Sequence, residues 1–118
     1  DLGEWWTNTR GLPLPLGGNA IRADLRPHFE ELAAVLYDSI AFGLENRDRA
    51  VDYALNYARG MQKDLADQFV GMYVNDWTLS YGPTGRQAVR QLLKEAADSG
   101  MVPPLEQIEF ITTDRQPQ

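Results

Sequence analysis

Apolar residues recur at helical spacing in the longest patterned stretch of the chain, residues 24–44. Intervals of three and four place them on one side of an α-helix. These positions are Phe29, Leu32, Ala33, Leu36, Ile40 and Leu44. Asp24 can cap the helix, and Pro27 falls in its first turn, where the missing N–H costs nothing. The pattern therefore predicts a long helix from Asp24 to Leu44.

The same spacing predicts three further helices. The second begins at Asn46 or Asp48 and covers residues up to 58, the third covers 64–73, and the fourth runs from Pro83 or Thr84 to the stop at Gly100. The inward positions are expected to be Val51, Ala54, Leu55 and Ala58, then Leu65, Phe69, Met72 and Tyr73, then Ala88, Val89, Leu92, Leu93 and Ala96. Residues 78–82 form a connector.

The front of the chain carries a different pattern. Asp1 and Glu4 have the spacing of a capping box, which predicts a short helical turn over residues 2–8 that ends by Gly11. Residues 11–19 then place leucines at every second position, with Pro13 and Pro15 between them. Proline forbids helix and removes ladder donors, so this segment is expected to be extended, at a sheet edge or a crossing between domains.

Two short segments are candidates for strands. Residues 20–23 can continue the extended segment, and residues 105–111, which carry Leu105, Ile108, Phe110 and Ile111, can form a last strand or a docking turn. One strand cannot satisfy its own backbone groups, so the rest of the sheet is expected in a part of the protein that this chain lacks. The start at Asp1 instead of Met fits a cut inside a longer protein.

The predicted fold class is therefore α/β, mostly helical in this chain with one or two strands. The predicted organisation is an inter-lobe crossing segment and strand at 1–23, the helical part of a lobe at 24–111, and a flexible polar tail at 112–118.

Composition excludes several classes of protein. With a net charge of −6, no basic stripe can neutralise a phosphate backbone, so nucleic-acid binding is not expected. No apolar run approaches the roughly 20 residues that cross a bilayer. The absence of cysteine fits a reducing, cytoplasmic location and makes a structural zinc site unexpected.

No residue carries a convincing catalytic signature. His28 is the only histidine and has no Ser or Cys partner at a recognisable spacing, so we interpret it as a surface residue. Carboxylate pairs such as Glu30 and Glu31 lie near helix N-termini, where negative charge is favourable in itself. Several aromatic residues could line a pocket, but core packing is the more usual role; these are Trp5, Trp6, Tyr73, Trp77 and Tyr81.

Particular strings resemble a known enzyme family. DLGEWW at 1–6 and RGLPLPLGG at 10–18, with MYVN at 72–75, LSYG at 79–82 and GRQAVR at 85–90, are similar to segments of the 1,4-dihydroxy-6-naphthoate synthase family of the futalosine route to menaquinone. The sister family, chorismate dehydratase, is similar at 1–4 and 11–13 and stays an alternative, but residues 14–18 favour the naphthoate synthases. The resemblance runs from Asp1 to about Pro104, under half of such an enzyme.

The resemblance implies a fold like that of type 2 periplasmic binding proteins, with a ligand held between two α/β lobes. It implies a lyase that converts cyclic dehypoxanthine futalosine, a nucleoside-derived small molecule, without metal or organic cofactor. The family's proposed proton acceptor, a histidine just upstream of the segment matching Asp1, is absent from this chain, and His28 does not match it. Leu14, Pro15, Leu16 and Gly17 match the crossing segment and are expected to form substrate-binding cleft wall.

Three hypotheses follow. The first is the C-terminal part of this lyase, inactive without the missing N-terminal lobe. The second is a non-catalytic ligand-binding lobe, because the same fold hosts solute receptors. The third is a small helical interaction module. Under the first two, exposed surface should lead the chain to associate with a partner lobe or with itself.

Overall fold

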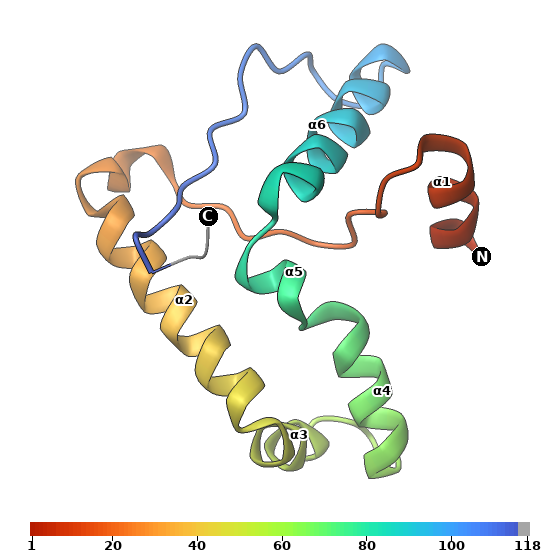
Figure 1. The fold of residues 1–118 in the computed structure, drawn as a ribbon, viewed down its shortest axis with the longest axis vertical. Helices are drawn as coiled ribbons and strands as arrows, with labels where there is room; N and C mark the ends of the chain where they lie inside the picture. The colour runs from red at the N-terminus through yellow and green to blue at the C-terminus, as the bar shows by residue number, and fades with distance from the viewer. Residues whose placement is uncertain (116–118) are drawn as a thin grey trace. The chain divides into compact units, whose positions relative to one another are not determined.

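The computed structural model of the chain describes residues 1–115, and these form helices joined by irregular segments (Figure 1). Their contacts group into two compact units. The first unit consists of Asp1–Ala20 and Tyr81–Ile111, and the second of Ile21–Ser80 with residues 112–115.

The first unit contains helix α1 (Leu2–Arg10), the leucine-proline segment and helix α6 (Gly82–Asp98). The Asp1 carboxylate accepts a hydrogen bond of 2.9 Å from the backbone N–H of Glu4, which caps α1 as predicted. Gly11 ends the helix in the left-handed conformation, with φ of 66°, which a residue with a side chain rarely adopts. The segment beyond it, residues 11–22, forms neither helix nor strand, and the two prolines account for the absence of helix.

The second unit is a chain of helices: η1 (Ala23–His28, a 3₁₀-helix), α2 (Phe29–Glu45), α3 (Arg47–Leu55), α4 (Lys63–Tyr73) and α5 (Asp76–Leu79). Helix α3 packs against both α2 and α4, and α5 packs against α2. Val51 on α3 and Ala66 on α4 are its buried apolar residues. Arg47 ties α3 to α4, because its Nε donates to Asp67 Oδ1 at 2.6 Å and its Nη2 donates to the Asp67 carbonyl oxygen at 2.7 Å.

The predicted strands are wrong. Residues 20–22 are irregular, η1 begins at Ala23, and residues 105–111 form no strand, so residues 1–115 contain no β-structure at all. The part of the fold-class prediction that the structure bears out is the mostly helical character of the chain. Residues 20–22 and 105–111 form no strand because an isolated strand leaves its backbone N–H and C=O groups unpaired.

The predictions for residues 24–44 and for the connector at 78–82 are wrong in part. The predicted helix over 24–44 is divided, because Pro27 lies in the 3₁₀-helix η1 and the α-helix begins at Phe29. Asp24 does not cap it; its carboxylate instead accepts two hydrogen bonds from Arg22. The connector at 78–82 is partly the helix α5, which Asn75 and Thr78 stabilise with a reciprocal capping box.

The inward face predicted for the third helix is also wrong. Ala66 is its buried residue, whereas Leu65, Phe69, Met72 and Tyr73 are all exposed. The helical spacing correctly put these four side chains together, but the described residues of the second unit do not bury them.

The end of the described chain belongs to the second unit. Thr113 is buried, and the Arg115 guanidinium pairs with the Asp38 carboxylate on α2. Residues 116–118 of the predicted tail lie outside the described residues. None of the helices in the described residues is both long and apolar enough to cross a bilayer.

Candidate functional site

The candidate site is the segment Leu14 to Gly17, which the first unit holds at both ends. On one side Leu12 is buried, with 9% of its surface exposed. On the other side Gly18 lies against the side chain of Tyr81, since a Cβ at Gly18 would be 3.1 Å from the Tyr81 hydroxyl oxygen. Both anchors come from the same compact unit, so the segment between them has a defined path.

Between these anchors the segment becomes progressively more open. Leu14 and Pro15 are half-buried, whereas Leu16 is 57% exposed. A Cβ at Gly17 would meet no other atom within 4 Å. The middle of the segment therefore presents one apolar side chain and one bare stretch of backbone, both free to contact a ligand.

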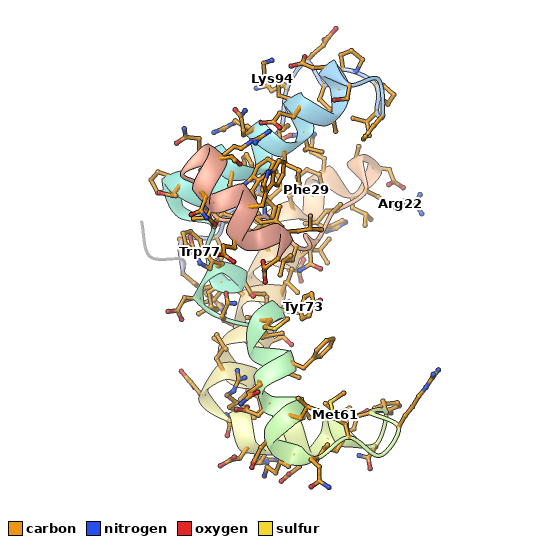
Figure 2. All side chains as sticks on the ribbon, turned by 90° about the vertical axis from the view of Figure 1, so that its right-hand side faces the viewer. Arg22, Phe29, Met61, Tyr73, Trp77 and Lys94 are labelled. Carbon is orange, nitrogen blue, oxygen red and sulfur yellow. The ribbon has the colours of Figure 1, made fainter. Side chains whose placement is uncertain are left out.

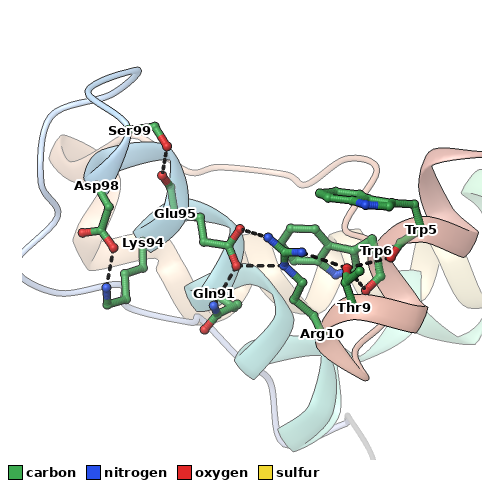
Figure 3. A network of polar contacts seen from close by, with 9 residues as sticks. All are labelled: Trp5, Trp6, Thr9, Arg10, Gln91, Lys94, Glu95, Asp98 and Ser99. Atoms are coloured by element: carbon green, nitrogen blue, oxygen red, sulfur yellow. Dashed lines mark hydrogen bonds and ion pairs between the residues drawn. The ribbon is translucent and has the colours of Figure 1, made fainter.

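An ion pair fixes α1, which leads into this segment, to α6 (Figure 3). The Arg10 Nε donates to Glu95 Oε1 at 3.0 Å, and the Arg10 Nη2 donates to Glu95 Oε2 at 2.7 Å. The Gln91 amide donates to the same carboxylate at 2.8 Å. The hydrogen bonds from Arg10, and then that from Gln91, lower the pKa of Glu95 to about 2. The carboxylate therefore stays charged at every pH at which the protein would work.

Aromatic rings surround the guanidinium of this pair. The Arg10 guanidinium carbon lies 4.7 Å from the centre of the Trp5 ring and 5.2 Å from that of Trp6. Trp6 is buried, while Trp5 is half-exposed. Cation–π contact and the bidentate ion pair together hold the guanidinium in one orientation.

A second aromatic contact supports the entry to α6. The rings of Tyr81 and Phe110 meet edge to face, with 6.0 Å between their centres. The guanidinium groups of Arg86 and Arg90 lie 5.6 and 5.0 Å from the centre of the Phe110 ring. Tyr81 therefore contacts both the Phe110 ring and the Gly18 end of the candidate segment.

None of the other residues considered from sequence is part of the segment Leu14 to Gly17 itself. His28 belongs to the second unit, is exposed, and has its Nδ1 3.9 Å from the Glu31 carboxylate. Of the five aromatic candidates only Trp6 is buried in the core; Trp77 and Tyr73 are about half-exposed in the second unit. Within residues 1–115, no group of three or more His, Asp or Glu side chains is arranged to hold a metal ion.

The Arg10–Glu95 pair and the contact between Gly18 and Tyr81 were not predicted. The partners are far apart in the chain, and neither pair has a local spacing rule. An arginine in the last turn of a helix suggests only a favourable interaction with the helix dipole.

This arrangement can bind and shape a ligand, but Leu14, Pro15, Leu16 and Gly17 themselves carry no acidic, basic or nucleophilic side chain. Leucine and proline side chains exclude water and complement an apolar surface, and the glycine backbone allows close approach. The geometry therefore fits one wall of a ligand site whose catalytic groups are supplied by other residues.

Comparison with known proteins identifies the relatives of this chain. The model of a family described as "Menaquinone biosynthesis" matches residues 1–98. The chain is 38% identical over 106 residues to 1,4-dihydroxy-6-naphthoate synthase of Streptomyces coelicolor, covering 89% of this chain and 38% of that protein. It is 35% identical over 105 residues to the enzyme of the same name from Thermus thermophilus, covering 88% of this chain and 39% of that protein.

A solved structure is similar as well. The crystal structure of protein AF1704 from Archaeoglobus fulgidus matches with a TM-score of 0.71 and 35% identity, over 86% of this chain and 39% of that one. The resemblance noted from the sequence strings is thus confirmed. The chain spans about two fifths of the length of the relatives that it matches.

Proposed function

Because the chain belongs to the menaquinone biosynthesis family, we propose that it is the C-terminal part of a lyase that converts cyclic dehypoxanthine futalosine into 1,4-dihydroxy-6-naphthoate. The support is the name shared by two relatives that match nearly nine tenths of the chain. The substrate and the reaction type come from the family resemblance. In this proposal the enzyme is cytoplasmic and uses neither a metal nor an organic cofactor.

The intact enzyme would have two lobes of the periplasmic-binding type, with the substrate between them. The leucine-proline segment would cross between the lobes, and Leu14, Pro15, Leu16 and Gly17 would form one wall of the cleft. The observation that carries this assignment is the anchoring of the segment at Leu12 and Gly18, which leaves Leu16 and Gly17 open. An apolar wall suits a substrate whose product is a naphthalene ring system, because it excludes water from the ring face.

The proton transfer would fall to residues outside this chain. His28 is exposed, its nearest charged partner is a surface carboxylate, and it lies in the other compact unit from the candidate segment. The chain would therefore contribute shape and position, and it would not turn over substrate by itself.

A chimera tests the proposal. In the Streptomyces coelicolor relative, this chain would replace the matched portion, and formation of 1,4-dihydroxy-6-naphthoate would be followed by chromatography. We expect the chimera to be active and the isolated chain to be inactive. A folded chimera without activity, in an assay in which the parent enzyme is active, would contradict the proposed function. Activity of the isolated chain would contradict its dependence on the missing lobe.

The wall itself is tested by Leu16→Ala in the active chimera. Losing apolar contact with substrate and transition state alike should raise KM about tenfold, since about 1.4 kcal/mol corresponds to that factor, and leave kcat nearly unchanged. Leu2→Ala is the matched control, because Leu2 is exposed on α1 and outside the segment. Equal effects of the two substitutions would remove Leu16 from the site.

A further inference from the structure

Tyr81 is held in place beside the candidate segment by its ring contacts. Its ring meets the Phe110 ring edge to face, with 6.0 Å between the two centres. The guanidinium groups of Arg86 and Arg90 contact the same Phe110 ring and limit its movement. At the far end of the side chain, the Tyr81 hydroxyl oxygen would lie 3.1 Å from a Cβ at Gly18. The direction of the Tyr81 side chain is therefore fixed by an aromatic neighbour and by backbone.

The Tyr81 hydroxyl makes no hydrogen bond to any described residue. Tyr81 is half-buried, yet its hydroxyl is open to solvent. Among the partly or fully buried side chains of residues 1–115, only the Trp6 indole nitrogen is enclosed without a partner. The hydroxyls of Tyr53 and Tyr57, by contrast, lie 3.2 Å apart and share a hydrogen bond. Because a phenol can donate one hydrogen bond, Tyr81 offers an unused donor at a fixed position.

This donor lies at one end of the apolar wall. Gly18 follows the open residues Leu16 and Gly17 directly, and two residues of backbone span at most about 7 Å. That separation is short enough for one bicyclic ligand to lie on Leu16 and reach the Tyr81 hydroxyl. Ligand sites combine an apolar lining with a few polar groups, which fix the orientation of the ligand. The segment Leu14 to Gly17 carries no polar side chain, and Tyr81 brings one to its end.

We propose that the Tyr81 hydroxyl donates a hydrogen bond to a ring oxygen of the substrate, and thereby selects an oxygenated naphthalene ring system and orients it on Leu16. The inference rests on the proposed function, in which the product, 1,4-dihydroxy-6-naphthoate, carries two ring oxygens. A ring oxygen accepts a hydrogen bond from a phenol, whereas an unsubstituted ring edge would displace water from the hydroxyl and leave it unpaired. Tyr81 is thus a specificity-determining residue, and proton transfer stays with residues outside this chain.

The experiment measures ligand binding to the chimera with the Streptomyces coelicolor relative, with and without Tyr81→Phe. Calorimetry under anaerobic conditions compares 1,4-dihydroxy-6-naphthoate with naphthalene-2-carboxylate, which has the same ring system and carboxylate but lacks both ring hydroxyls. Tyr81→Phe should weaken binding of the dihydroxy compound at least about fivefold, because one hydrogen bond is lost. Binding of naphthalene-2-carboxylate should change less than about twofold, since it cannot pair with the hydroxyl. The value of kcat/KM should fall with the affinity for the dihydroxy compound.

Two further variants separate the hydroxyl from the fold. Figure 2 shows Tyr73 on α4, and Tyr73→Phe is the matched control because it removes a tyrosine hydroxyl in the second unit. It should change the affinity for neither ligand. Phe110→Leu keeps the Tyr81 hydroxyl but removes the ring that holds it, so it should weaken the dihydroxy compound alone, and by less than Tyr81→Phe does. Tyr81→Phe keeps its own ring, so its circular dichroism should match that of the parent chimera.

Two outcomes would overturn the inference. A loss of similar size for both ligands would mean that Tyr81→Phe disturbs the site as a whole, and no loss for either would mean that the hydroxyl does not reach the ligand. In both cases an active chimera would leave the proposed function standing. An inactive chimera that still shows the ligand-specific loss would overturn the proposed lyase activity and support the role of Tyr81.

Discussion

Arg10 on α1 and Glu95 on α6 are joined by two nearly parallel hydrogen bonds, although 85 residues separate them in the chain. The pair is mostly buried, with side-chain exposures of 26% and 31%. An arginine and a carboxylate in this geometry fix both position and orientation, which a lysine cannot do. The contact thereby sets the direction in which the chain leaves α1 toward the candidate segment.

The Glu95 carboxyl should titrate far below its ordinary pKa of 4.5, at about 2. Because the pKa is lowered in the folded state, the pair stabilises the protein fully above about pH 4.5, and this stabilisation is lost as the pH falls toward 2. The measurement is the carboxyl ¹³C shift of Glu95 as a function of pH. Glu95→Gln should lower stability at neutral pH and remove this part of the acid dependence. A midpoint near 4.5 in the folded protein would show that the ion pair does not form.

Arg10→Lys should weaken the link between α1 and α6 although it keeps the charge. Lysine cannot make the second parallel hydrogen bond or stack over the rings of Trp5 and Trp6. We expect a lower melting temperature, a changed near-ultraviolet circular dichroism signal from the tryptophans, and a Glu95 pKa closer to its ordinary value. Arg22→Lys is the matched control, because the pair of Arg22 with Asp24 is exposed and local. This substitution should leave the melting temperature, the tryptophan signal and the Glu95 pKa unchanged.

Adjacent glycines in the candidate segment should respond differently to alanine. The Cβ added by Gly17→Ala would meet no atom within 4 Å. The substitution should therefore stabilise the fold by about 0.4–1 kcal/mol, because it restricts the unfolded chain. At Gly18 the new Cβ would lie 3.1 Å from the Tyr81 hydroxyl, so part or all of this gain should be lost. Removing the hydroxyl with Tyr81→Phe should restore the gain in the double variant, as measured by chemical denaturation. Additive effects at Gly18 and Tyr81 would show that the two do not touch.

Local sequence rules predicted where most helices lie, but not which of their faces are buried. The Asp1 cap and the stop at Gly11 follow from interactions within one turn, and the structure confirms both. Pro27 was correctly placed near a helix start, but only the structure shows that a 3₁₀-helix precedes the α-helix. The short helix α5 has a local signal in the Asn75 and Thr78 capping box, which apolar spacing alone does not show.

The burial of helix faces and the anchoring of the candidate segment could not be predicted, because they depend on residues that are distant in the chain or outside it. Periodicity grouped Leu65, Phe69 and Met72 on one side of α4, but it does not say whether anything covers that side. The candidate segment was found through family resemblance and the proline pattern. Its anchoring by Leu12 and Tyr81 needed the fold, since no local rule pairs residue 18 with residue 81.

Gly71 leaves room for the contact of Arg47 with Asp67, here called the clamp between α3 and α4. A Cβ at Gly71 would lie 2.8 Å from Arg47 Nη2, the atom that donates to the Asp67 carbonyl oxygen. Alanine is favoured over glycine inside a helix by about 0.5–1 kcal/mol, so Gly43→Ala in α2, where nothing lies within 4 Å, should stabilise by that amount.

Gly71→Ala should gain less than Gly43→Ala or become destabilising, because Arg47 must shift away from Asp67. In an Arg47→Ala background the obstacle is gone, and Gly71→Ala should then stabilise as much as Gly43→Ala does. Urea denaturation of the four variants measures these differences in the free energy of unfolding. If Gly71→Ala stabilises the protein as strongly with Arg47 present as without it, the guanidinium does not occupy the space over Gly71, and the clamp between α3 and α4 is not formed in solution.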